Sequence, residues 1–322
     1  MSLKNHLIPI YEQEFPLMWA DKQFHKLWSP DEISLEKDVL DIKINLSESE
    51  KYGLLRTLSL FTLLETHAGD EYWGGRFKTT IFKDEAEFHS MASLFSAVEL
   101  YVHTRFYKRI NELLHVDTKE FYTSFQNEKI LRERIKLVQD AISHKNDLVS
   151  LGCFSIVEGA MLYSQFAYIL HFQANGKNKV PGIVSGINFS VIDENIHASA
   201  GAECFRYKMS KYAGDKKEIE DAIKEFAVKM IDQTPEINSC VFEKGGILGL
   251  SEDILLTFEK SRVNECFRML GYPPLFTISN NKIADWFYKD INTFHYNDNF
   301  ANLSREYVKG WNKDKLRWKQ KD

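Results

Sequence analysis

Proline and glycine are scarce in this sequence of 322 residues, with 7 and 16 copies respectively. They fall mostly between segments in which apolar residues repeat at helical spacing, and signals for β-strands are weak throughout. The sequence holds no internal repeat, no low-complexity run and no linker between domains. We therefore expect a single all-α domain over residues 1–322, ending in a short basic tail at about residues 308–322.

Cysteine is also scarce, and its four copies are far apart, at Cys153, Cys204, Cys240 and Cys266. None of them forms a Cys-x-x-Cys pair, which argues against a zinc site or a disulfide framework. Isolated free thiols favour a reducing compartment, so a cytoplasmic protein is expected.

Basic charge is not in excess, because 41 Lys and Arg stand against 46 Asp and Glu and the net charge is −5. The sequence therefore has no overall basic character of a nucleic-acid binder. Its first residues, MSLKNHLIPIYEQE, contain no apolar signal core, and no GxxxxGK[ST] phosphate-binding loop is present.

One apolar run, from Leu148 to Phe172, is long enough to cross a bilayer. Glu158 lies at its middle, and a carboxylate at that depth costs at least about 3 kcal/mol. A buried helix with a functional carboxylate is the better interpretation, and we expect no membrane association.

Apolar periodicity and cap signals predict several long helices. Ser47 to Glu50 matches a capping box that opens the first of them. Further helices are expected over about residues 84–115, 147–174, 181–212 and 216–234, and a last one follows Ser251 and stops at Gly271. The pattern predicts an all-α bundle with additional helices.

Four of these helices carry acidic or imidazole side chains among apolar neighbours, in order Glu65, then Glu99 and His103, then Glu158, then Glu194 and His197. Several buried carboxylates in one bundle would repel each other, and bound cations remove that cost. Carboxylate with imidazole suits iron or manganese. Ferritin-like di-metal bundles use one Glu from each of two helices and Glu-x-x-His from each of the other two, and Glu194 to His197 fits that motif directly.

With these motifs the sequence resembles the small (beta) subunit of class I ribonucleotide reductases over nearly its whole length. The resemblance is carried by LWSPDEISLEKD around Trp28, LLETHAGD around Glu65, HTRFY from His103, SIVEGAMLYSQFA around Glu158, DENIH from Asp193, and Asn299-Phe300 with Glu306-Tyr307. It implies a ferritin-like bundle that generates an oxidising equivalent at a pair of metal ions. A separate large subunit would use that equivalent to reduce ribonucleotides.

The resemblance also implies a role for each matching residue. The metal ligands would be Glu65, Glu99, His103, Glu158, Glu194 and His197, around two iron ions, two manganese ions or a mixed manganese/iron pair. Tyr107, one helical turn beyond His103, would carry the radical, sheltered by Leu162 and Phe166. Trp28, Asp193 and His103 would form the internal electron-transfer chain.

The second helix departs from the family pattern, which places Glu three residues before His. That position here is Leu100, and Glu99 lies four residues before His103. A π-bulge could aim Glu99 inward; otherwise one carboxylate is missing. Counting from His103 makes Tyr107 the radical residue, whereas counting from Glu99 gives Phe106, as in the tyrosine-free class Ic proteins that use a metal-only oxidant. Glu65 in place of Asp is also a class Ic trait. We favour Tyr107.

The end of the chain departs as well. Family members usually carry a C-terminal extension with a redox tyrosine and a peptide that docks the large subunit. Here VKGWNKDKLRWKQKD follows Tyr307 and contains no tyrosine. Three interpretations stay open: a short basic docking tail, a relay through Trp311 or Trp318, and a merely solvated basic end.

The partners implied are the large (alpha) subunit, a second copy in a homodimer, and a protein that donates electrons or supplies the oxidant. The rival interpretations are another ferritin-like carboxylate enzyme, such as a ligand-binding oxidase or a desaturase, and a non-enzymatic metal store or silent structural partner. Trp28, Asp193 and the NF…EY segment favour the reductase, because the rivals need no relay to a second protein.

Overall fold

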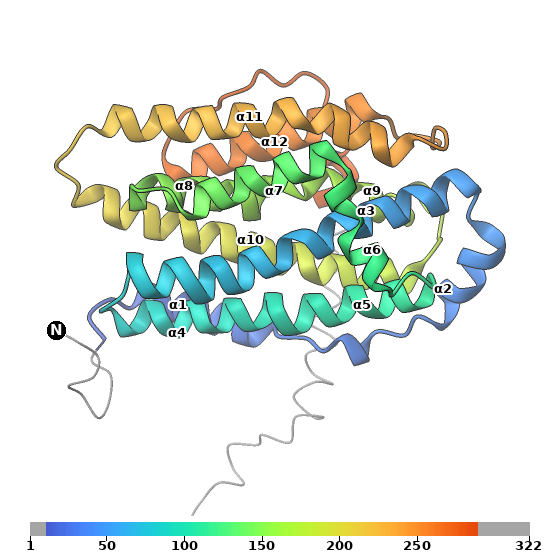
Figure 1. Cartoon of the computed structure of the whole chain (residues 1–322), viewed down its shortest axis with the longest axis horizontal. Coiled ribbons are helices and arrows are strands. Elements are labelled where there is room, and N and C mark those ends of the chain that lie inside the picture. The colour runs from blue at the N-terminus through green and yellow to red at the C-terminus, as the bar shows by residue number, and fades with distance from the viewer. Residues whose placement is uncertain (1–10, 289–322) are drawn as a thin grey trace, which may run out of the picture.

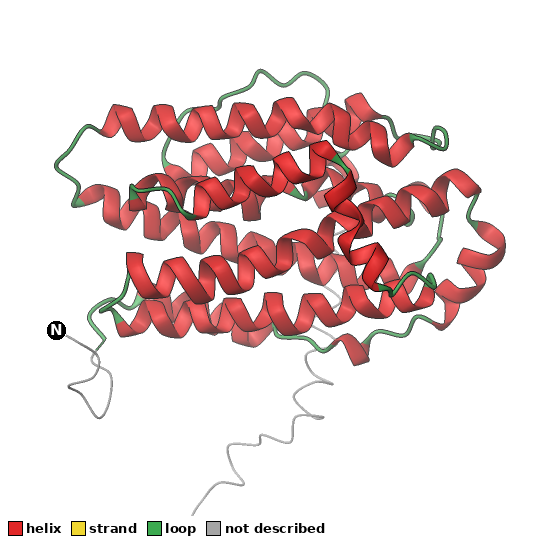
Figure 2. Cartoon of the chain, viewed as in Figure 1, coloured by secondary structure: helices red, strands yellow, loops and turns green. Residues whose placement is uncertain are grey.

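The computed structural model describes residues 11–288, and it is built from helices that lie largely side by side (Figures 1 and 2). Within the described residues, β-pairing is limited to an isolated bridge between Ile247 and Leu250. The α-helices are α1 Phe15–Lys26, α2 Glu36–Leu40, α3 Glu48–Thr66, α4 Ala86–Ala97, α5 Thr104–Leu113, α6 Lys119–Thr123, α7 Lys129–Ile142, α8 Asp147–Ile156, α9 Tyr163–Leu170, α10 Pro181–Ser210, α11 Lys216–Phe242 and α12 Glu252–Leu270. The all-α prediction is confirmed.

The first long helix begins at the predicted capping box. The Ser47 N–H donates to Glu50 Oε2 over 2.7 Å, and the Glu50 N–H donates to Ser47 Oγ over 3.2 Å, so α3 starts with both ends of the motif satisfied. Beyond Thr66 the helix continues as a π-helix, η4, over His67–Ile81. Together α3 and η4 form one continuous helical rod, and Glu65 lies near its middle.

Two further rods are α-helices interrupted by a π segment. The first runs through α4, the π-helix η5 (Val98–His103) and α5, and the second through α8, the π-helix η7 (Val157–Met161) and α9. Helix α10 packs against α8 and α9 and completes the set that carries the predicted ligands. The π-helices η5 and η7 each contain a predicted ligand, and functional sites are where π-bulges often occur.

The start of α10 is fixed by a carboxylate from another helix. Asp38 of α2 accepts hydrogen bonds from the backbone N–H groups of Gly182 and Ile183, at 3.0 and 2.7 Å. These groups are among the N–H groups that a helix start leaves without an internal partner. The carboxylate therefore sets the position of the helix that carries Glu194.

Helix α11 corrects the predicted end at Thr234, because the helix continues through Pro235 to Phe242. In the turn just before the proline, the Met230 carbonyl accepts hydrogen bonds from Thr234 Oγ1 and from Arg134 of α7. Buried Val241 then packs in the core beyond it. Tertiary contacts therefore override the local helix-breaking preference of proline.

The long apolar helix of residues 147–176 lies inside the bundle. Its most apolar window passes the length and composition test for a membrane span, but 94% of that window is buried by the rest of the chain. Such burial is that of a core helix, as expected from Glu158 at its middle. This helix contributes much of the continuous hydrophobic core between the rods.

Candidate metal centre

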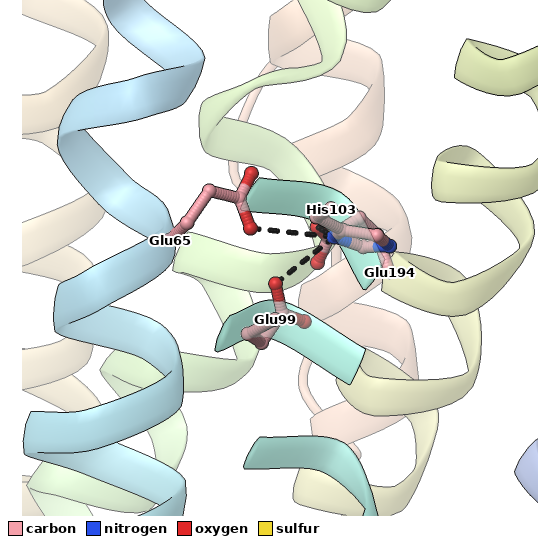
Figure 3. A group of neighbouring side chains, drawn as sticks. All are labelled: Glu65, Glu99, His103 and Glu194. Atoms are coloured by element: carbon pink, nitrogen blue, oxygen red, sulfur yellow. Dashed lines mark hydrogen bonds and ion pairs between the residues drawn. The ribbon is translucent and has the colours of Figure 1, made fainter. Parts of the chain in front are cut away.

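The first ligand group gathers side chains from three rods. Glu65 of α3, Glu99 and His103 of η5, and Glu194 of α10 each offer one atom within 4.8 Å of the others, and all four residues are buried (Figure 3). His103 Nδ1 lies 3.0 Å from Glu99 Oε2, 3.3 Å from Glu65 Oε2 and 3.6 Å from Glu194 Oε1. The group has the donor set that iron and manganese prefer.

A second group lies directly beside the first and shares two of its members. Glu99, Glu158, Glu194 and His197 also offer ligand atoms within 4.8 Å of one another. Glu99 turns Oε2 toward His103 and Oε1 toward His197, at 3.0 and 2.6 Å. Glu194 likewise places Oε1 3.6 Å from His103 Nδ1 and Oε2 4.0 Å from His197 Nδ1. Two carboxylates that each face both groups can bridge a pair of ions.

The π-helix η5 is what brings Glu99 into the centre. Its widened turn is seen in the bonds from Thr104 Oγ1 and the Thr104 N–H to the Glu99 carbonyl, five residues back. Glu99 is fully buried, whereas Leu100, at the usual family position, is 40% exposed. Glycine at position 69 allows this approach, because a Cβ there would lie 2.9 Å from Glu99 Cβ.

The carboxylates of the centre have strongly perturbed acidities. Burial and the charge of Glu99 raise the pKa of Glu65 well above its usual range, and burial with the charges of Glu99 and Glu158 does the same for the pKa of Glu194. Burial opposes ionisation of Glu99 as well, but His103 outweighs it and holds the pKa of Glu99 well below its usual range. Burial disfavours the charged form of His103, but Glu99 and Glu65 raise its pKa well above the ordinary value.

Several buried polar atoms here have no hydrogen-bond partner in the described part of the chain. They are Glu65 Oε1, Glu99 Oε1, Glu194 Oε2 and both ring nitrogens of His197. Glu99 Oε1 and His197 Nδ1 lie 2.6 Å apart without hydrogen-bond geometry, as expected for atoms directed at a common ion. Buried polar atoms are rarely left unsatisfied. The residues therefore fit a pair of metal ions.

Asp193 connects the centre to the predicted relay residue. His103 Nε2, on the far side of the ring from the ligand group, lies 3.1 Å from Asp193 Oδ2. The indole N–H of Trp28 donates to the same oxygen over 2.8 Å. Gln23 of α1, which sequence reasoning missed, donates to Asp193 Oδ1 over 2.7 Å. The structure thus brings all three predicted relay residues together.

Tyr107 is fully buried, with its ring centroid 6.1 Å from that of His103. Burial and the charge of Glu65 raise the pKa of Tyr107 well above its ordinary value, which keeps the phenol protonated. Phe61, another residue that was missed, stacks on Tyr107 at 5.2 Å, and the predicted shield Phe166 lies behind Phe61 at 4.9 Å.

The remaining predicted residues occupy different places. Phe106, the alternative to Tyr107, packs against Trp28 at 5.4 Å and against Gly186. Leu162 is buried, but it borders a small cavity beside Arg134 and Glu259. Trp73 of η4, which was missed, donates its indole N–H to Glu158 Oε1 over 2.7 Å. The predicted NF…EY segment and the tail with Trp311 and Trp318 lie outside the described residues.

A helical bundle with two adjoining carboxylate–imidazole groups that share two glutamates defines a ferritin-like di-metal carboxylate protein. The particular family follows from comparison with known proteins. The family described as "Ribonucleotide reductase, small chain" matches residues 4–282, and the chain belongs to it.

Relatives of known sequence support this assignment. The chain is 25% identical over 276 residues to a ribonucleoside-diphosphate reductase subunit beta of Bacillus subtilis, covering 83% of this chain and 80% of the relative. It is 24% identical over 305 residues to the corresponding subunit of Chlamydia pneumoniae, covering 86% and 82%.

Solved structures share the fold. The dimanganese(II)-NrdF of Streptococcus sanguinis superimposes with a TM-score of 0.77 at 18% identity, covering 86% of this chain and 96% of that one. The ribonucleotide reductase R2 subunit of Clostridium botulinum gives a TM-score of 0.74 at 18% identity, covering 87% and 89%.

Proposed function

We propose that this chain generates and stores the oxidising equivalent of a class I ribonucleoside-diphosphate reductase. The observation that carries the proposal is that Glu99 and Glu194 are shared by two ligand groups, one of which is linked to Trp28 through His103 and Asp193. The shared glutamates suit the binding of a metal pair. The hydrogen bonds from His103 through Asp193 to Trp28 suit transfer of the oxidising equivalent out of the centre. A ligand-binding oxidase, a desaturase or a metal store has no need of the link.

The six ligands of the proposal are Glu65, Glu99, His103, Glu158, Glu194 and His197, and they suit two iron ions, two manganese ions or one of each. When bound, the metal pair supplies the one-electron oxidising power. The chain orients the imidazole of His103 through Asp193, whose carboxylate accepts a hydrogen bond from Nε2, the ring nitrogen that faces away from the ligand group. The buried aromatic rings around Tyr107 keep water away from the radical that we assign to it.

The oxidising equivalent stored on Tyr107 would pass through His103, Asp193 and Trp28 to a large (alpha) subunit, where the ribonucleotide is reduced. The chain would therefore be inactive alone, work as a homodimer in the cytoplasm, and depend on a protein that donates electrons or supplies the oxidant. A metal-only oxidant is the second candidate, favoured by Glu65 in place of Asp.

The test combines metal analysis with electron paramagnetic resonance. After loading with iron or manganese and exposure to oxygen, the protein should hold about two ions per chain. It should show a phenoxyl signal and support ribonucleotide reduction only with its large subunit. No bound metal would overturn the di-metal proposal, whereas full activity without a phenoxyl signal would establish the metal-only oxidant.

A further inference from the structure

Trp73 stands at the second ligand group in direct contact with a proposed ligand. Its indole N–H donates to Glu158 Oε1 over 2.7 Å, and its ring centroid lies 6.0 Å from that of His197. The side chain is fully buried, and it comes from η4, the π-helix that continues the rod bearing Glu65. Two of the four members of that group therefore have an indole as neighbour.

The centre consequently has one tryptophan on each side. Trp28 reaches the first group through two hydrogen bonds, with Asp193 and His103 in between. Trp73 reaches the second group through a single hydrogen bond to Glu158. Indoles are among the side chains that give up an electron most readily, so the shorter connection belongs to a capable donor that has no part in the relay described above.

We propose that Trp73 is a second redox-active tryptophan, which donates an electron to the oxidised metal pair from the Glu158 side. The inference rests on the proposed function, because the oxidised pair is the oxidant. One electron leaves the indole ring and reduces the metal pair by one electron, while the proton on Nε1 stays in its hydrogen bond to Glu158. As a metal ligand Glu158 is ionised, and its negative charge stabilises the indole radical cation beside it.

The surroundings of Trp73 favour an electron vacancy that stays on this residue. Tyr72 is the nearest other readily oxidised ring in the described part of the chain, at 5.0 Å, and the Tyr72→Phe control below tests whether it takes part. Phe77 and Phe95, both with ring centroids 5.0 Å from that of Trp73, are far harder to oxidise. Trp73 therefore competes with Tyr107 for the oxidising equivalent, and an electron vacancy on Trp73 is not passed on to these phenylalanines.

The test uses the full chain with Tyr107→Phe, which removes the competing phenol. Protein made with ring-deuterated tryptophan is loaded with iron or manganese, exposed to oxygen, frozen within seconds and examined by electron paramagnetic resonance. We expect a radical whose hyperfine splitting collapses on deuteration, which survives a further Trp28→Phe change and is lost with Trp73→Phe. Tyr72→Phe is the matched control and should keep the signal. A signal that persists in Trp73→Phe, or none that responds to deuteration, would overturn the inference.

A second measurement needs no substitution. The unaltered protein is taken through repeated reduction and oxygen exposure, digested, and examined by mass spectrometry for oxygen added to tryptophan. The Trp73 peptide should gain several times more oxygen than the Trp286 peptide, and equal gains would overturn the inference. A chain that binds and oxidises two ions without marking Trp73 leaves the proposed function standing, whereas a chain that binds no metal removes both.

Discussion

Trp28 and His103 bond to the same oxygen of Asp193, at 2.8 and 3.1 Å. The other nitrogen of His103 faces the carboxylates of the first ligand group. The indole is thus two hydrogen bonds from the nitrogen that faces the ligand group, in a buried environment where such bonds are strong.

Replacing Trp28 with Phe should separate radical export from radical storage. The ring packing against Phe106 and Phe189 is largely kept, and the N–H that bonds to Asp193 is lost. We expect unchanged metal content and radical signal, while nucleotide reduction with the large subunit falls at least about tenfold, or about 1.4 kcal/mol in activation free energy. Trp19→Phe is the control, because that indole bonds to Glu203 instead. Full activity in Trp28→Phe would place the exit path elsewhere.

Tyr107→Phe should remove the organic radical and most of the activity with the large subunit, while metal binding survives. The phenol is the oxidisable group, and its ring lies near His103 inside a closed aromatic environment. Phe106→Tyr should change little, because that ring packs against Trp28 and Gly186. Electron paramagnetic resonance and turnover measure both variants. Undiminished activity of Tyr107→Phe would make a metal-only oxidant the leading account.

Moving the carboxylate of Glu99, a proposed ligand, to the usual family position should not restore the proposed centre. In a chain with Glu99→Ala and Leu100→Glu, the new carboxylate would start from a position that is 40% exposed and lies against Gly69, whereas Glu99 is fully buried. We expect metal content to fall below two ions per chain, as in Glu99→Ala alone, with Leu100→Glu alone keeping its metal. Metal analysis after gel filtration gives the answer. Restoration in the double variant would show that the turn at η5 shifts its register easily.

The metal-free protein should lose stability as pH rises. The folded-state pKa values of Glu65, Glu194 and His103 all lie above their ordinary values, so folding favours their protonated forms. That stability is present at low pH and is lost as pH rises through the folded pKa values, from about pH 5 upward. Glu99 has the opposite shift, and its contribution is lost only below that range.

Metal binding should reverse this trend, because it needs deprotonated ligands. Calorimetry of the metal-free and metal-loaded protein across this range should show melting temperatures that diverge as pH rises. Parallel curves would contradict the assignment of these side chains as ligands.

Much of this arrangement could be predicted from the sequence, for reasons visible in particular residues. Glu194 and His197 obey the α-helical spacing of the metal motif, and the capping box at Ser47 acts through neighbours in the chain. From the sequence, an inward-facing Glu99 could be predicted only as one of two alternatives. A π turn is selected by packing against other segments of the chain, here the close approach of Gly69 to Glu99.

Other features had no local signal at all. Trp73 and Gln23 owe their positions to helices that meet only in the folded chain, and neither has a ligand-like spacing to the motifs. The continuation of α11 past Pro235 likewise lies beside a contact between distant segments, because Arg134, about a hundred residues earlier, donates to the Met230 carbonyl. Side-chain contacts between remote segments decide these features, and sequence periodicity does not report them.

Because of the π turn at Glu99, the sequence position of this proposed ligand does not by itself determine where its side chain lies in the fold. One surplus residue between Glu99 and His103 is taken up within a single turn. Tyr107 beyond it still lies beside His103. A helix of this kind can gain or lose a residue without changing which side chains face the proposed centre. A search that requires a fixed spacing between Glu and His would therefore miss a group of side chains that come together in the fold as these do.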